Sequence, residues 1–213
     1  MKTLLIVESP HKAKTVAALA KPVIQGTVFA WACLGHLRDL PEDILGVEIE
    51  NGFTPQYKIH RNREKTVASL REKIMQADTV LLATDPDREG EAVAWHVTRV
   101  FESELQGKTV SRVIFNAITA SAIRAALKHP RSLDMGLVTA AIARRVLDRL
   151  VGYFISPRLW KGLPIRRQFV GANPRFIHAS SAGRVRTAAL RLLVEHERAR
   201  PTPSESWTVE VEW

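Results

Sequence analysis

Two short apolar runs, each followed at once by polar turn residues and a helix-like segment, constrain the fold of this 213-residue chain most strongly. They are TLLIV (3–7) and TVLLAT (79–84). Continuous apolar runs of this length are typical of parallel strands that are buried on both faces. The alternation of strand and helix continues to about residue 130. It predicts an α/β domain at 1–130 with a mainly parallel, four-stranded sheet flanked by helices.

Apolar periodicity and turn residues place the other elements of this region. We expect strands at 3–7, 23–31, 79–84 and 110–115 and helices at 11–20, 64–75, 89–101 and 119–127, with Thr119 as an N-cap. Residues 35–63 are polar and contain several Gly and Pro, so we expect this stretch to be largely loop.

Beyond residue 130 the alternation stops, and the charge changes as well. Residues 1–143 hold 18 Lys and Arg against 16 Asp and Glu, whereas residues 144–200 hold 13 against 3. Most of those 13 are arginines, whose planar donors suit phosphate oxygens, so this part is expected to bind a polyanion. A solvated basic face without a specific ligand is the alternative.

This second part is expected to be mainly helical. We expect an arginine-rich region at 131–205 and the first strand of a further domain at 206–213. Within the region, helices are expected at 135–151 and 182–200, separated by a loop at 162–180 whose Gly, Pro and Arg content is typical of irregular structure.

Cysteine content and hydropathy limit where the protein works. Cys33 is the single cysteine, so the chain forms no internal disulfide and no cysteine-based zinc site, and we expect Cys33 to be a small buried residue. No apolar run approaches the roughly 18 residues that a membrane-spanning helix needs. We therefore expect a cytoplasmic protein without a membrane partner.

Acidic residues gather where the second apolar run gives way to a helix. Asp85, Asp87 and Glu89 alternate in ATDPDREGEA (83–92). Carboxylate oxygens on an open rim suit Mg²⁺, which keeps several waters and accepts one or two protein carboxylates plus substrate phosphate. A helix start that favours acids would explain Glu89 and Glu91, but it explains two aspartates around a proline less well. The pattern favours a metal site.

Glu8 ends the first apolar run in the same way. Because open α/β sheets place ligands at the carboxyl ends of their strands, we expect Glu8 and the acidic cluster to share one crevice. Lys12 follows in the first turn of the next helix, where a cation opposes the helix dipole, so a bound anion would relieve the conflict. The alternative is a solvated lysine on a surface turn.

At this point the residues resemble a known family. LLIVESPHKAKT together with ATDPDREGEA is similar to the Toprim domain of type IA DNA topoisomerases, and to bacterial topoisomerase I more than to topoisomerase III. Three further segments agree and extend the resemblance over nearly the whole chain. They are GHLRDLP (35–41), ARRVLDRLVGYFISPRLW (143–160) and SAGRVRTAALRLLVEHE (181–197). The implied fold is Rossmann-like Toprim followed by part of a helical DNA-binding domain.

The resemblance also implies roles for individual residues. Glu8 resembles the family's acid/base and metal-site glutamate, and Lys12 resembles the lysine that steadies the scissile phosphate. The implied Mg²⁺ ligands are Asp85, Asp87 and Glu89. The implied DNA contacts are His36, Arg144, Asp148 and Arg184.

The sequence also departs from the family pattern. Residues 162–180 are longer than the usual link, and Arg186 and Thr187 replace the usual Gln-Ser. Type IA enzymes attack phosphate with a tyrosine followed closely by an arginine, and neither Tyr57 nor Tyr153, the two tyrosines here, has that setting. We therefore expect this chain to lack the nucleophile and to be part of a longer protein.

The implied activity is relaxation of negatively supercoiled DNA through transient cleavage of one strand, with Mg²⁺ and without ATP. The lack of a P-loop agrees with the lack of a nucleotide cofactor. Two alternatives stay open. A Toprim nuclease or primase would use the same acids for phosphoryl transfer, and a non-catalytic DNA-binding module would use only the arginine-rich part.

Overall fold

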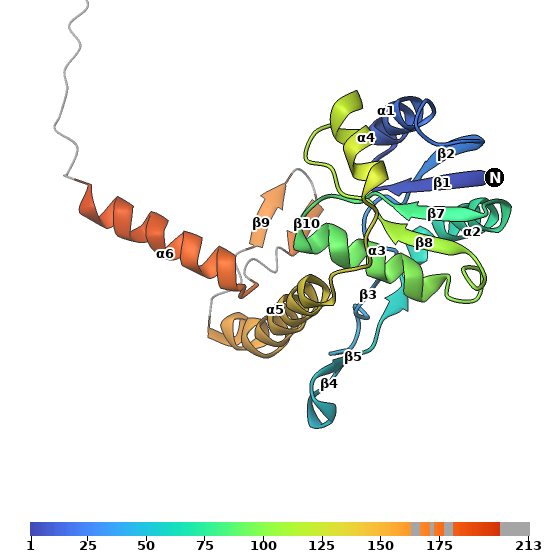
Figure 1. Ribbon diagram of the computed structural model, residues 1–213. Coiled ribbons are helices and arrows are strands. Elements are labelled where there is room, and N and C mark those ends of the chain that lie inside the picture. The colour runs from blue at the N-terminus through green and yellow to red at the C-terminus, as the bar shows by residue number, and fades with distance from the viewer. Residues whose placement is uncertain (163–166, 171–172, 177–180, 201–213) are drawn as a thin grey trace, which may run out of the picture. The chain divides into compact units, whose positions relative to one another are not determined.

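A parallel sheet forms the centre of the first part of the chain. The computed structural model describes residues 1–162, 167–170, 173–176 and 181–200. The sheet has the order β2-β1-β7-β8, and every pairing in it is parallel (Figure 1). Its strands are β1 (Lys2–Val7), β2 (Thr27–Ala32), β7 (Thr79–Leu82) and β8 (Thr109–Arg112). The predicted fold class is therefore confirmed.

Helices cover both faces of this sheet. On one face, α1 (Pro10–Ala20) and α4 (Ala120–Lys128) pack on Leu5, Val7 and Leu81. On the other face, α2 (Glu64–Gln76) and α3 (Arg88–Val100) pack on Leu4, Ile6 and Val80. Successive residues of a strand point to opposite faces, so the unbroken apolar run of β1 is what two covered faces require.

Side-chain caps fix where three of these helices begin. Ser9, Asp87 and Thr119 precede α1, α3 and α4, and each side chain accepts a hydrogen bond from a backbone N–H in the first turn of its helix. Such caps satisfy donors that have no partner within the helix. Thr119 confirms the N-cap that the sequence predicted.

The connection between β2 and α2 is mostly irregular, as expected, but it contains short paired segments. Strand β3 (Arg38–Asp39) pairs antiparallel with β6 (Lys58–Ile59), and β4 (Val47–Glu48) pairs antiparallel with β5 (Thr54–Pro55). Two 3₁₀ turns, η1 (Ile49–Asn51) and η2 (Arg61–Arg63), complete it.

Two long helices belong to the rest of the chain. Helix α5 (Met135–Gly162) runs eleven residues beyond its expected end and continues through Pro157, and α6 is Arg184–Ala199. The expected loop at 162–180 contains an antiparallel pair, β9 (Arg167–Val170) and β10 (Asn173–Phe176), in its described residues. The expected strand at 206–213 lies outside the described residues.

Contacts divide the chain into two compact units, Met1–Leu147 and Asp148–Trp213. The domain limits expected from the sequence, 130 and 205, stay a prediction. Across the described ranges, none of the helices combines the length and the apolar character that a membrane span requires.

Candidate active site at the carboxyl edge of the sheet

Glu8 and Asp85 meet where two neighbouring strands end. Glu8 follows β1, and Asp85 lies three residues after β7. The backbone N–H of Asp85 donates to Glu8 Oε1 at 3.0 Å. Because β1 and β7 are parallel and adjacent, their carboxyl ends open on the same edge of the sheet, which is where open α/β folds place ligands.

Lys12 reaches the same point from the first turn of α1. Its Nζ lies 2.5 Å from Asp85 Oδ1, and the two side chains are 34% and 39% exposed. A pair that is this accessible to solvent is open to exchange of partners, so another anion can replace Asp85 at the ammonium group.

Asp87 caps the helix that follows it. Its Oδ1 accepts a hydrogen bond from the Gly90 N–H at 2.7 Å, which caps α3. A Cβ at Gly90 would lie 2.2 Å from the carbonyl oxygen of Asp85, so only glycine allows the helix to start this close to the acidic loop. The other carboxylate oxygen of Asp87 has no hydrogen bond among the described contacts.

Glu89 lies on the first turn of α3 and faces His36. Its Oε2 is 3.4 Å from His36 Nε2, and the Glu89 side chain is 51% exposed. The His36 ring in turn packs edge-on against His96, with ring centroids 5.3 Å apart. The structure thus places His36, expected as a DNA contact, beside an expected metal ligand. Its contact with DNA stays a prediction.

His96, which packs on His36, is itself surrounded by an arginine and aromatic rings that were not predicted from the sequence. Arg38 Nε donates to His96 Nδ1 at 2.7 Å, and the Arg38 guanidinium lies over the rings of Tyr57 and Trp95 at 5.0 and 4.8 Å. Burial, with the nearby Arg38 and His36, lowers the pKa of His96 to about 3. His96 is therefore neutral and accepts the Arg38 hydrogen bond near neutral pH.

The oxygen donors at this edge suit a hard divalent ion. Within residues 1–162, 167–170, 173–176 and 181–200, no three His, Cys, Asp or Glu side chains form a group that could hold a metal ion. Mg²⁺ does not need three such ligands, because it can bind through one or two carboxylates and keep several waters. Asp85, Asp87 and Glu89 supply carboxylates on an open rim, and Asp85 and Glu89 now contact Lys12 and His36. The donor chemistry fits Mg²⁺.

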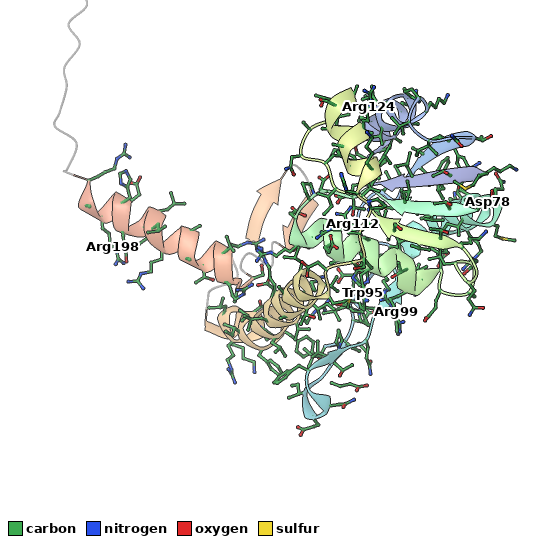
Figure 2. The ribbon with its side chains drawn as sticks, in the orientation of Figure 1. Asp78, Trp95, Arg99, Arg112, Arg124 and Arg198 are labelled. Carbon is green, nitrogen blue, oxygen red and sulfur yellow. The ribbon has the colours of Figure 1, made fainter. Side chains whose placement is uncertain are left out.

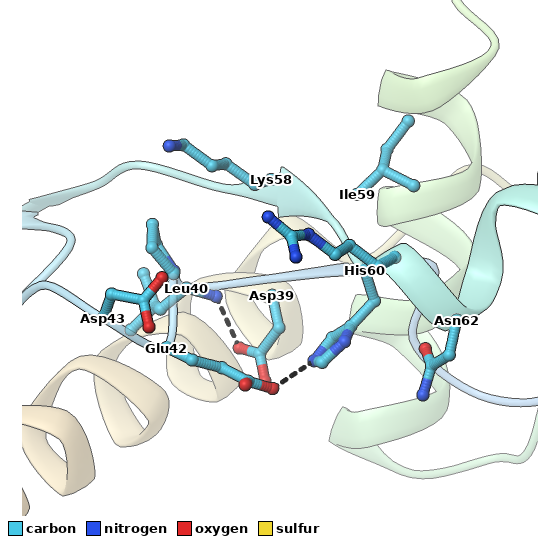
Figure 3. Close-up of a pocket in the computed structure, with 10 residues that line it drawn as sticks. Asp39, Leu40, Glu42, Asp43, Lys58, Ile59, His60 and Asn62 are labelled. Atoms are coloured by element: carbon cyan, nitrogen blue, oxygen red, sulfur yellow. Dashed lines mark hydrogen bonds and ion pairs between the residues drawn. The ribbon is translucent and has the colours of Figure 1, made fainter.

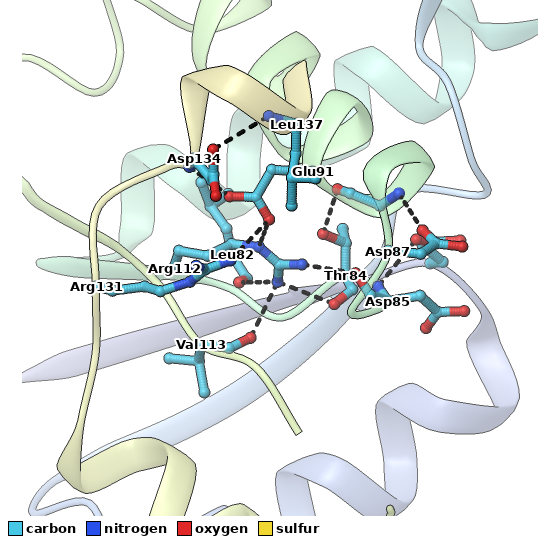
Figure 4. Close-up of polar contacts among 12 residues, drawn as sticks. Leu82, Thr84, Asp85, Asp87, Glu91, Arg112, Val113, Arg131, Asp134 and Leu137 are labelled. Atoms are coloured by element: carbon cyan, nitrogen blue, oxygen red, sulfur yellow. Dashed lines mark hydrogen bonds and ion pairs between the residues drawn. The ribbon is translucent and has the colours of Figure 1, made fainter. Parts of the chain in front are cut away.

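A buried pair behind the acidic loop was also missed. Arg112 donates to Glu91, and both side chains are almost completely buried (Figure 4). Figure 2 shows Arg112 inside the first unit, whereas Arg99 and Arg124 lie on its surface. The one available signal was an arginine within the strand-like run TVSRVIF (109–115), because a charged residue in such a run needs a buried partner.

The GHLRDLP segment also borders a pocket of 460 Å³ (Figure 3). Asp39, at one wall, accepts hydrogen bonds from Arg145 of α5 through both carboxylate oxygens, at 2.8 and 2.5 Å. His60 and Glu42, from two other walls, lie 3.6 Å apart. None of the residues expected at the active site lines this pocket.

In the second unit, Asp148 and Arg184 form an ion pair. Arg184 Nε donates to Asp148 Oδ1 at 2.7 Å, and this hydrogen bond raises the pKa of Arg184 above its ordinary value. The backbone N–H of Ala182 donates to Ser156 Oγ at 3.0 Å, so a second contact holds the segment before α6 against α5. Both residues are among the DNA contacts that the resemblance implied, and their contact with DNA stays a prediction.

Comparison with known proteins connects these features. Residues 3–118 match the family model of the Toprim domain, and residues 132–213 match that of DNA topoisomerase. The structure of full-length topoisomerase I from Thermotoga maritima is similar, with a TM-score of 0.70 and 40% sequence identity over 92% of this chain. The chain belongs to the type IA DNA topoisomerase family. The resemblance found in the sequence is thereby confirmed.

Membership in the type IA topoisomerases sets the general chemistry of the site. Toprim domains generally bind a divalent metal, and DNA is the substrate of the topoisomerase family. This chain spans 30% of the length of the Thermotoga topoisomerase. The activity of a whole topoisomerase and the roles of single residues in this one are therefore matters for proposal.

Proposed function

We propose that this chain provides the metal-bearing part of a type IA topoisomerase that relaxes negatively supercoiled DNA without ATP. Transient cleavage and resealing of one strand would change the linking number. The observation that carries the proposal is the meeting of Glu8, Lys12 and Asp85 at the carboxyl edge of the sheet. An acid and a cation that each contact the residue proposed to ligate the metal are suited to transfer of a phosphodiester.

Each residue has a distinct part in this proposal. Asp85, Asp87 and Glu89 would hold Mg²⁺, with Glu8 beside them. The ion, when bound, offsets negative charge on the phosphate. Glu8 moves a proton to or from the oxygen of the cleaved bond, and Lys12 turns from Asp85 to the scissile phosphate. Attack by a tyrosine conserves the energy of the phosphodiester bond in a phosphotyrosine link, so resealing needs no ATP.

The two tyrosines of this chain do not fit the nucleophile's part. The Tyr57 ring packs on His96, with ring centroids 4.7 Å apart, and burial raises the pKa of its hydroxyl. A nucleophile needs its pKa lowered or a base beside it. Tyr153 packs edge-on against its neighbour Phe154 on α5. Because the chain has no other tyrosine, the nucleophile would come from outside it.

The arginine-rich part of the chain would hold single-stranded DNA. Arg184, which Asp148 orients, and Arg144 are the proposed phosphate contacts, and His36 is proposed to approach the strand beside the metal site. Sites for single strands combine cations that follow the backbone with surfaces for the bases. A cytoplasmic location at the DNA follows from this function.

Incubation with supercoiled plasmid and Mg²⁺, alongside titration of a short labelled single strand, tests the proposal. The expected result is oligonucleotide binding that weakens with salt, with neither nicking nor relaxation of the plasmid. Metal-dependent nicking that Asp85→Asn abolishes would establish the nuclease alternative instead. Failure to bind the oligonucleotide at low salt would refute the DNA-holding role.

A further inference from the structure

Arg112 holds the loop that carries Asp85 from behind. Only 1% of the residue is exposed, and two of its three guanidinium nitrogens donate to main-chain oxygens. Nη1 donates to the carbonyls of Leu82 (2.8 Å), Thr84 (2.9 Å) and Val113 (3.0 Å). Nη2 donates to the carbonyl of Asp85 at 2.7 Å. One side chain on β8 therefore binds the end of β7 and the first residues of the acidic loop (Figure 4).

Glu91 balances the buried charge and joins a third segment to it. Its Oε2 accepts from Arg112 Nε at 2.8 Å and from Arg131 Nη2 at 3.3 Å. Its Oε1 accepts from the backbone N–H of Asp134 at 2.7 Å. Asp134 in turn accepts from the Leu137 N–H at 3.1 Å in the first turn of α5. The carboxylate thus fixes α3, β8 and the residues before α5 to one another.

Stability alone does not account for such a pair. Taking two ions out of water costs several kcal/mol each before their attraction repays it, and apolar side chains of similar volume often serve a core equally well. What the pair adds is geometry, because a planar guanidinium directs its donors at fixed angles. Here those donors define the positions of the Thr84 and Asp85 carbonyls.

The Asp85 backbone is consequently held from two directions. Arg112 binds its carbonyl oxygen, and Glu8 binds its N–H. We propose that Arg112 and Glu91 are positioning residues that set where the Asp85 carboxylate stands relative to Glu8 and Lys12, and so tune the metal site. This inference rests on the proposed function, since it assigns Asp85 to the metal. Neither residue touches the reacting atoms.

Arg112→Lys is the decisive variant, because lysine keeps the charge beside Glu91 but has no fork to reach Thr84 and Asp85. The matched control is Arg71→Lys, in which the same change is made to a surface pair with Glu104. Two readouts are compared: amide hydrogen exchange at Asp85, relative to the amides of β1, and Mg²⁺ affinity by calorimetry.

The expected result is at least about ten-fold faster exchange at Asp85 with β1 unchanged, and a Mg²⁺ affinity weaker by about 10- to 100-fold, the usual effect of losing a group that orients a ligand. The control should match wild type in both. Unchanged exchange at Asp85, or faster exchange with unchanged Mg²⁺ affinity, would overturn the positioning role.

Two further outcomes separate this inference from the proposed function. If the wild-type chain binds no Mg²⁺, the proposed metal site is wrong, and exchange at Asp85 still decides whether the pair positions the loop. If Arg112→Lys does not fold, Glu91→Met/Arg112→Met replaces it, because removing both ions leaves no unpaired buried charge. Exchange at Asp85 as slow as in wild type in that double variant would refute the inference.

Discussion

Lys12 Nζ lies 2.5 Å from Asp85 Oδ1, so the cation at the start of α1 neutralises the first carboxylate after β7. A cation at a helix N-terminus is unfavourable unless an anion is near, and Asp85 is that anion here. The same ammonium group competes with a metal ion for the carboxylate. Metal binding to Asp85 would then release the Lys12 ammonium group, which could turn to a phosphate.

Lys12→Met should therefore tighten Mg²⁺ binding. Removing a positive charge at this distance lowers the repulsion that an incoming cation meets by roughly 1 kcal/mol in a solvent-exposed setting, which corresponds to about five-fold in affinity. Isothermal titration calorimetry with Mg²⁺ measures it, and Lys12→Arg, which keeps the charge, is the control. Weaker binding in Lys12→Met would mean that Lys12 builds the site instead of competing for it.

Local patterns in the sequence were enough to predict most helices and strands of the first unit. The apolar run of β1 predicted a strand covered on both faces, and Thr119 predicted the start of α4, since both depend on residues within a few positions. The same reasoning placed Glu8 and Asp85 on one edge, because parallel neighbouring strands end together, and the structure brings them into contact.

Contacts between distant residues escaped this reasoning. Glu91 looked like one more acid at a helix start, yet it lies buried against Arg112, 21 residues away, because β8 runs beside β7. Asp148 pairs with Arg184 across 36 residues. The irregular composition of 162–180 concealed β9 and β10, whose pairing depends on cross-strand contacts and not on propensity.

The isolated chain should form no covalent adduct with DNA. Tyr57 is packed between Arg38 and His96 with its pKa raised by burial, and Tyr153 packs on Phe154. Among the hydrogen bonds of the described residues, neither hydroxyl is bonded to a base that would activate it. Incubation with a labelled oligonucleotide followed by denaturing electrophoresis detects an adduct. A labelled band that persists in wild type but disappears in Tyr57→Phe or Tyr153→Phe would overturn this expectation.

Arg184→Ala should weaken binding of single-stranded DNA and flatten the salt dependence of its affinity. One lost phosphate contact changes the logarithmic slope by roughly 0.7 on a single strand. Asp148→Ala should leave binding unchanged or weaker, because Asp148 orients the Arg184 guanidinium. Arg124→Ala, at an exposed position on α4, removes equal charge elsewhere and serves as the control. Tighter binding by Asp148→Ala with no effect of Arg184→Ala would contradict the proposed DNA-binding role of Arg184 and Asp148.

Protonation of His96 should make the fold less stable in acid. Its pKa falls from 6.5 in the unfolded chain to about 3 in the folded one, so the unfolded state binds more protons in this window. The contribution of neutral His96 to the free energy of unfolding is fully present above pH 6.5, and it is lost as the pH falls toward about 3. The free energy of unfolding should decline with a slope of up to about 1.4 kcal/mol per pH unit.

Denaturant unfolding of wild type and His96→Asn between pH 4 and 7 measures this contribution, since asparagine keeps an acceptor for Arg38 but does not titrate. The variant should show a shallower pH dependence. His11→Asn, at an exposed position on α1, is the control. Equal slopes in wild type and His96→Asn would show that His96 stays protonatable in the folded state.

Mg²⁺ titration of the purified chain by isothermal calorimetry tests the central claim most directly. We predict saturable binding to wild type and loss of binding in Asp85→Asn/Asp87→Asn. Glu42→Gln/Asp43→Asn, which removes two exposed acids outside the site, should bind Mg²⁺ like wild type. Absence of saturable binding in wild type, or equal binding by Asp85→Asn/Asp87→Asn, would contradict the assignment of this edge of the sheet as the metal-bearing half of a topoisomerase active site.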